Sequence, residues 1–127
     1  MERAPLLLFP LLFATVFIGG CIEERHDHRA PAIDGFLLDG KPDGQFVLLP
    51  PDGGPPEYQT LLAKMDAVLE GEKRSVVYYT IGEDGFARLE RHFRSLSVDQ
   101  FGSLVSRPDV VSYKEAYFRL HYGYVQE

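Results

Sequence analysis

The sequence predicts an α+β domain: a small antiparallel sheet of four to five strands with two helices packed on one face. Three observations support this prediction. Short runs of β-branched and aromatic residues are bounded by turn sequences, and one segment has apolar residues at helical spacing. Five Asp-Gly pairs also punctuate the chain. Asp-Gly favours tight turns because both residues tolerate positive φ. The 127 residues suffice for one small domain.

The first two strands are expected at residues 35–38 and 45–49, across the turn-forming segment 39–44. Both are short aliphatic runs bounded by turn residues. A loop follows at 50–56, because the sequence PPDGGPP excludes a helix and a central strand. The aspartates of this region lack the spacing of an EF-hand calcium loop, so we interpret them as turn residues.

Residues 57–71 form the clearest predicted helix. Their apolar residues recur at i, i+1, i+4, i+7 and i+8, which places one apolar stripe along a helix. Glu57 suits the N-terminal end, where a carboxylate is stabilised by the helix dipole, and Gly71 is a natural stop. We expect the stripe to be core; it consists of Leu61, Leu62, Met65, Val68 and Leu69.

Residues 75–81 are β-branched and aromatic, and they predict a strand. Residues 86–96 fit two patterns, since a helix would gather their large apolar side chains on one side and a strand would alternate apolar with charged ones. We favour the strand, because the preceding GEDG has hairpin length and turn chemistry. The sequence Ser-Val-Asp-Gln at 97–100 is moreover a capping box, which predicts a new helix from residue 98.

Two elements complete the predicted domain. The helix that begins at 98 continues to about residue 106, and Pro108 ends it. Residues 116–125 alternate Phe, Leu and Tyr with Arg, His and Gly, and therefore predict a closing strand with one apolar-aromatic face. The domain is then expected to span residues 34–127.

The N-terminal segment has the pattern of an export signal. Residues 4–18 carry no charge, but they fall short of the about 20 residues of a transmembrane helix, and two prolines interrupt them. This length suits the apolar region of a signal peptide. Two small residues, Gly19 and Gly20, then precede Cys21, the only cysteine of the chain.

Residues 18–21, Ile-Gly-Gly-Cys, resemble the lipobox of bacterial lipoproteins, in which an aliphatic residue and two small residues precede a cysteine. The resemblance implies cleavage between Gly20 and Cys21 and a diacylglyceryl lipid on the Cys21 thiol. Ile22, in place of an aspartate, implies sorting to the outer membrane. Two other interpretations remain: a free thiol behind a signal cleaved elsewhere, and an uncleaved membrane anchor.

Once a signal peptide of residues 1–20 is removed, residues 21–33 are expected to form a flexible tether. They are charged, contain proline and lack periodicity. His26 and His28 are candidate metal ligands, but two alternate histidines fall short of the three or four ligands of a zinc site. We therefore expect a solvated tether, with no metal and no other cofactor.

Composition and motifs argue against several function classes. The formal net charge is −6, whereas a nucleic-acid-binding surface needs clustered Lys and Arg. A single cysteine allows no disulfide within the chain and no cysteine-based zinc site. The sequence has no G-x-S-x-G, no G-x-G-x-x-G and no Walker motif. We therefore do not expect an enzyme.

Two candidate contact surfaces remain. If 86–96 is a strand, Arg88, His92 and Arg94 share one face, which suits an anionic partner, although a solvated sheet face is the simpler interpretation. Tyrosine-rich segments also make contact surfaces, but in a chain without Trp the tyrosines must also build the core. The candidate contact tyrosines are Tyr113, Tyr117, Tyr122 and Tyr124.

Taken together, the sequence predicts a membrane-anchored envelope lipoprotein with a small non-enzymatic domain. We expect the lipid on Cys21 to hold it at the cell membrane or the outer membrane, facing the periplasm or the exterior. The domain would act through contacts with an envelope protein, or as an accessory to envelope machinery. The alternative is a periplasm-facing module that binds a small ligand or a metal.

Overall fold

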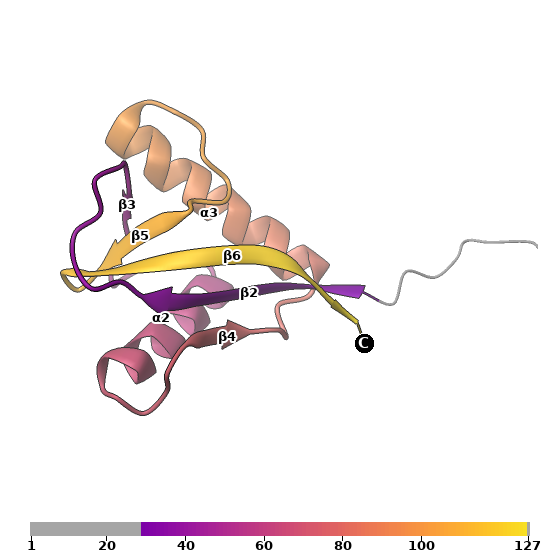
Figure 1. Cartoon of the computed structure of the whole chain (residues 1–127). Helices are drawn as coiled ribbons and strands as arrows, with labels where there is room; N and C mark the ends of the chain where they lie inside the picture. Colours follow the sequence, from indigo (N-terminus) through magenta and orange to yellow (C-terminus); the bar gives the residue numbers. More distant parts are fainter. Residues whose placement is uncertain (1–28, 127) are drawn as a thin grey trace, which may run out of the picture. The chain divides into compact units, whose positions relative to one another are not determined.

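The computed structural model describes residues 29–126, which form one five-stranded sheet and two helices (Figure 1). The predicted α+β class is confirmed. The elements in chain order are β2 (Arg29–Leu37), β3 (Val47–Leu48), α2 (Pro56–Leu69), β4 (Val76–Tyr78), α3 (Glu83–Phe101), β5 (Val110–Tyr113) and β6 (Ala116–Gln126).

The sheet has the strand order β3-β5-β6-β2-β4. The pairs β2–β4 and β5–β6 are antiparallel, but β3 pairs with β5 in parallel. The sheet is therefore mixed, and the prediction of a purely antiparallel sheet is wrong. β2 and β3, expected as neighbours across a turn, are separated by β5 and β6, because the 11-residue β6 takes the central position. The Leu38 N–H donates to the Tyr117 carbonyl at 2.8 Å, which ties the end of β2 to β6.

Both helices lie behind the sheet in Figure 1, so they cover the same face, as predicted. The core lies between the two layers. The predicted apolar stripe of α2 faces it, with Leu61 and Met65 fully buried. The sheet contributes mainly β-branched and aromatic side chains, which suit a pleated surface buried on one side. The largest fully buried side chains are Tyr58, Phe93, Phe118, Ile33, Leu61, Met65, Leu89 and Leu120.

The main correction concerns residues 83–101, which form one helix, α3. The predicted strand at 86–96 and the separate helix from 98 are both wrong. Gly85 belongs to the GEDG sequence that we interpreted as a turn, but a Cβ there would lie 2.9 Å from the Glu57 side chain. Glycine in this first turn therefore allows α2 and α3 to approach closely.

The predicted capping serine also has another role. Ser97 is fully buried inside α3, where its Oγ donates to the Arg94 carbonyl at 3.0 Å and accepts from the Val105 N–H at 2.8 Å. The Ser97 hydroxyl thus holds the segment that follows α3 through the hydrogen bond from Val105, and it does not cap the start of a helix. α3 ends instead at Gly102, whose φ of 75° places it in the left-handed region.

The strands differ from prediction at two further places. β2 begins at Arg29, and Ala32 and Ile33 are buried, so residues 29–33 belong to the sheet rather than to the predicted tether. β5 was not predicted, because all four of its residues are buried and show no alternation of polar and apolar side chains. The predicted signal peptide, Cys21, His26 and His28 lie outside the described residues.

The two outer strands of the sheet are protected differently. At β3 the Gln100 side chain acts like a neighbouring strand: its Oε1 accepts from the Leu48 N–H and its Nε2 donates to the Leu48 carbonyl, both at 2.8 Å. At β4, no described residue other than those of β2 is hydrogen-bonded to the strand backbone. Within residues 29–126, the outer side of β4 is thus the sheet edge that is left unpaired.

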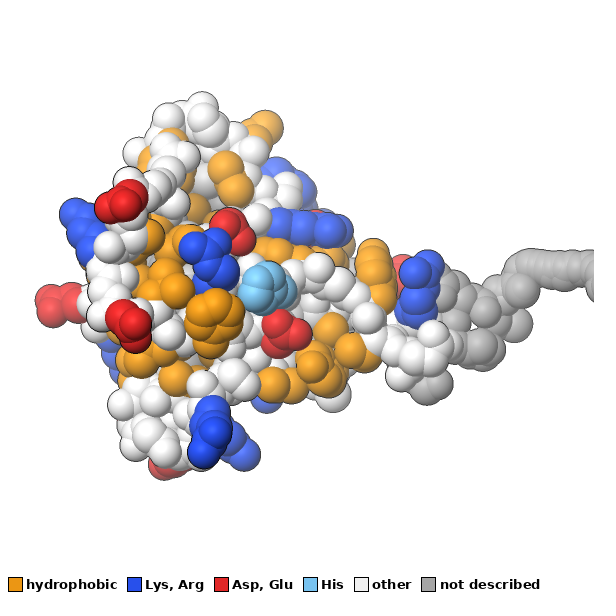
Figure 2. All heavy atoms as spheres, viewed as in Figure 1, with side chains coloured by type: hydrophobic (Ala, Val, Ile, Leu, Met, Phe, Trp, Pro, Cys, Tyr) orange, Lys and Arg blue, Asp and Glu red, His pale blue; other side chains and the backbone are white. Residues whose placement is uncertain are grey.

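The face of the sheet opposite the helices is visible in Figure 2, where hydrophobic side chains are interspersed with side chains of both charges and a histidine. Two close contacts involve strand residues: His121 Nδ1 lies 3.5 Å from Asp34 Oδ1, and Arg119 pairs with Asp109 at 2.6 Å. This face therefore has a mixed character, with apolar and charged side chains side by side.

Candidate binding groove at the β4 edge

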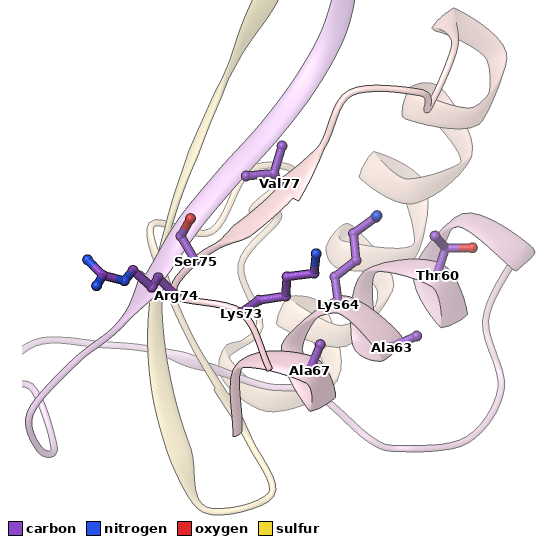
Figure 3. Close-up of a pocket in the computed structure, with 8 residues that line it drawn as sticks. All are labelled: Thr60, Ala63, Lys64, Ala67, Lys73, Arg74, Ser75 and Val77. Atoms are coloured by element: carbon purple, nitrogen blue, oxygen red, sulfur yellow. The ribbon is translucent and has the colours of Figure 1, made fainter. Parts of the chain in front are cut away.

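A groove of about 490 Å³ runs along the outer side of β4 (Figure 3). One wall comes from the exposed side of α2, and the other comes from β4 and the turn before it. We call this feature the β4 groove. It is lined by Thr60, Ala63, Lys64, Ala67, Lys73, Arg74, Ser75 and Val77.

The α2 wall follows from helix geometry. Residues 60, 63, 64 and 67 are spaced at i, i+3, i+4 and i+7, so they line one side of the helix. The core stripe lies on another side of α2, which leaves this wall accessible. Ala63 and Ala67 have short side chains, and they leave room beside the strand edge.

Three cations gather along the β4 groove: Lys64, Lys73 and Arg74. In Figure 3 the Lys64 and Lys73 side chains extend in the same direction between α2 and β4, whereas Arg74 points away from them. The Lys64 ammonium lies 5.4 Å from the centroid of the Tyr78 ring, a favourable cation–π distance. The groove therefore concentrates positive charge in a chain whose net charge is −6.

These three cations have no carboxylate partner among the described residues. In residues 29–126, four other cations do pair with carboxylates, among them Arg88 with Glu57 and Arg107 with Glu90. The lining residues supply ammonium, guanidinium and hydroxyl donors, and neither a carboxylate nor an imidazole. Such a site suits the binding of carboxylates or phosphates.

The predicted anionic-partner face does not exist as expected, because its residues lie on a helix. Arg94 follows His92 by two positions, which places it on nearly the opposite side of α3. Arg88 already binds Glu57, with Nη2 2.6 Å from Oε2, and this hydrogen bond lowers the pKa of Glu57. Arg94 donates to Ser106 Oγ at 2.9 Å.

His92 packs against the Tyr58 ring, with centroids 4.2 Å apart. Its Nε2 is buried and has no hydrogen-bond partner in the described structure, and burial lowers the pKa of the imidazole. Its ring lies directly beneath the loop at Gly54, where a Cβ would come within 2.9 Å of Nε2. His92 is thus a packing residue under a close backbone, not a surface ligand.

The predicted contact tyrosines differ in their burial. Tyr113 is a core residue, and Tyr122 is partly buried against the core. The Tyr113 hydroxyl lies 3.2 Å from Asp66 Oδ2, and the Tyr122 hydroxyl donates to the Pro108 carbonyl at 2.6 Å. Burial raises the pKa of both phenols. Tyr117 is half-buried against Phe46. Of the four, Tyr124 is the exposed one, at 54%.

The β4 groove was missed from the sequence. Its visible signal was Lys73-Arg74 directly before a predicted strand, after a helix with alanines on its polar side. That signal gains meaning only when β4 is known to be an outer strand, which depends on the sheet order.

Comparison of the chain with protein families, curated proteins and solved structures found no match. Residues 29–126 contain no group of three or more His, Cys, Asp or Glu side chains placed to hold a metal ion. Neither of the two helices in this part of the chain is long and apolar enough to cross a bilayer. The β4 groove must therefore be interpreted from its own geometry.

Proposed function

We propose that this protein is a membrane-anchored envelope lipoprotein whose domain holds another protein at the β4 groove. One observation carries the binding role: an unpaired strand edge lies beside three cations that lack carboxylate partners within the described residues. The lipobox-like residues 18–21 support the anchor. Two or three acyl chains on Cys21 would hold the protein firmly, since each buried methylene contributes about 0.8 kcal/mol.

A protein partner is favoured by the shape of the site. Protein partners commonly add a strand to an exposed sheet edge, where main-chain hydrogen bonds provide affinity. The groove is walled by short side chains on α2 and by flexible lysines, so it suits a chain segment better than a rigid ligand. Its ammonium, guanidinium and hydroxyl donors suit acidic side chains of such a segment.

A small anionic ligand is the second candidate. The volume of about 490 Å³ lies within the range typical of ligand pockets, and the hydroxyls of Thr60 and Ser75 flank the lysines. A thermal-shift series with phosphate and small dicarboxylates tests this candidate. Stabilisation by such a ligand, abolished by Lys73→Glu, would favour it over a protein partner.

The proposed function is tested with the full chain expressed in a bacterium. We expect the wild type to sediment with membranes and to begin at an acylated Cys21 by intact mass, and Cys21→Ser to do neither. A photo-crosslinking residue at Ala63 should form a discrete protein adduct. The same residue at Arg91, on exposed α3 surface, should not.

Charge reversal links the adduct to the groove. In Lys73→Glu/Arg74→Glu the adduct from position 63 should disappear while membrane attachment stays intact. Equal adducts from positions 63 and 91, or none from either, would contradict the contact role. A wild type that is soluble and cut elsewhere would contradict the anchor.

A further inference from the structure

We infer that the β4 groove takes an extended, acidic segment of the partner, which pairs with β4 as a sixth strand. This inference rests on the proposed function and specifies the chemistry of the partner.

The backbone of β4 has hydrogen-bonding groups on its outer side. Val76, Val77 and Tyr78 pair with β2 on one side, opposite Gly35, Asp34 and Ile33 respectively. In an antiparallel pair the backbone groups of successive residues point alternately toward the partner strand and away from it. β4 therefore also presents N–H and C=O groups outward. An extended segment about 4.8 Å away can bond to them.

The walls determine the side-chain pattern of this segment. Val77 is 43% exposed, and a β-branched or aromatic side chain of an added strand would pack beside it. On the other side, Ala63 and Ala67 leave space, while Lys64 extends from α2 and Lys73 from the turn before β4 (Figure 3). Since successive side chains of a strand point to opposite faces, the segment that fits alternates apolar and acidic residues.

The positive charge along the β4 groove favours acidic residues in the bound segment. Lys64 and Lys73 extend between α2 and β4, while Arg74 lines the groove but points away from them (Figure 3). None of the three has a carboxylate partner in the described part of the chain. The net charge of −6 repels an acidic segment from the rest of the surface. Complementary potentials of this kind steer a partner to one site and suppress contact elsewhere.

A second copy of this chain fits less well. Pairing two β4 edges would bring a second Lys64, Lys73 and Arg74 to the same groove. Like charges brought together at an interface cost free energy, and neither copy offers a carboxylate among the lining residues. The occupant is therefore a segment of a different protein.

The test uses the purified full chain in detergent and a fluorescent, acetylated and amidated Glu-Val-Glu-Val-Glu peptide. Fluorescence anisotropy measures Kd at low and at physiological salt. We expect the peptide to bind, and a Lys-Val-Lys-Val-Lys peptide to bind at least about tenfold more weakly, because charge-assisted hydrogen bonds contribute on that scale. Hydrogen exchange of the β4 amides should slow when the acidic peptide is bound.

Two matched changes identify the contacts. Lys73→Glu/Arg74→Glu should weaken binding at least about tenfold, whereas Lys41→Glu/Arg91→Glu, with the same change in net charge, should leave Kd within about twofold. Circular dichroism confirms that both double variants are folded.

An acidic peptide with alternate amides N-methylated keeps its charge and loses strand pairing. It should bind about tenfold more weakly than the unmodified peptide.

The contrary outcomes are distinguishable. Alternate amides can be N-methylated in two ways, at the odd or at the even positions of the peptide. If both methylated peptides bind as tightly as the parent peptide, strand pairing is refuted while the proposed groove contact stands. Equal loss in the two double variants, or no binding of the acidic peptide, refutes the assignment to an acidic segment. Groove-dependent binding of phosphatidylglycerol vesicles without peptide binding would assign the cations to a lipid surface. Absence of groove-specific adducts in cells would instead refute the proposed function itself.

Discussion

Replacing Gly35 by alanine tests the closest packing within the sheet. Gly35 lies on β2, and a Cβ added there would collide with the Arg119 carbonyl oxygen on β6 and lie 2.8 Å from Leu120 Cδ2. The leucine tip can rotate, but the oxygen is part of the strand backbone and cannot move unless β6 shifts. Overpacking of a filled core costs about 1–3 kcal/mol, and we expect about 3 kcal/mol here because backbone must move.

This magnitude converts into a large thermal shift. In a domain of this size, 1 kcal/mol lowers Tm by about 4–8 °C, so Gly35→Ala should lower Tm by roughly 12–24 °C. A loss of about 3 kcal/mol is also a large fraction of the 5–15 kcal/mol typical of a folded domain. Thermal and urea unfolding, followed by circular dichroism, measure both quantities.

Gly123→Ala is the matched control, because Gly123 lies on the neighbouring strand β6. A Cβ there meets nothing within 4 Å, and its φ is not positive. The substitution should be neutral or stabilise the domain by up to about 1 kcal/mol, since alanine restricts the unfolded chain. If the two variants melt within about 3 °C of each other, the close approach of β2 and β6 is refuted.

Three further predictions follow from single side chains. Ser97→Ala leaves the half-buried Val105 N–H without its acceptor and should lower the free energy of unfolding by about 1–3 kcal/mol, measured by urea titration. Gln100→Ala reopens the β3 edge at Leu48; it should cost about 1 kcal/mol and increase concentration-dependent association in size-exclusion chromatography. Because burial lowers the pKa of His92, its contribution to stability is present above the unfolded value of 6.5 and is lost as pH falls below it. His92→Gln should therefore lose less stability than the wild type between neutral and mildly acidic pH, and identical pH profiles would contradict this cause.

The elements that were predicted correctly are those whose own residues determine them. The helix at 57–71 has a continuous apolar stripe, and the strand at 116–125 has a strict alternation, so local periodicity and burial agree. In α3 the local signals conflicted with the tertiary structure. Gly85 looked like part of a turn, but its missing side chain makes room for Glu57, and Ser97 looked like a cap, but its hydroxyl bonds to a later segment.

The candidate site depended on information that no local pattern contains. Its cations were visible as Lys73-Arg74, but their setting is determined by which strand lies outermost, and hence by the long-range pairing of β2 with both β4 and β6. The same limitation explains the wrong anionic-partner face. A strand, with a period of two residues, places Arg88, His92 and Arg94 on one face. A helix, with a period of 3.6 residues, places Arg94 nearly opposite His92. Only the tertiary structure decides between these two arrangements.

The sheet also separates the two roles that we propose for this protein. β2 starts at Arg29, and Gly35, six residues along it, lies opposite Val76 at the start of β4. Val76 is therefore about 20 Å along the sheet from the start of β2, and Lys73 and Arg74 precede Val76 in the chain. The proposed anchor is upstream of Arg29, and it therefore joins the domain at the far end of β2 from Lys73 and Arg74. A segment that binds beside Lys73 and Arg74 therefore meets the sheet at the end where β2 finishes, not at the end where the chain enters β2.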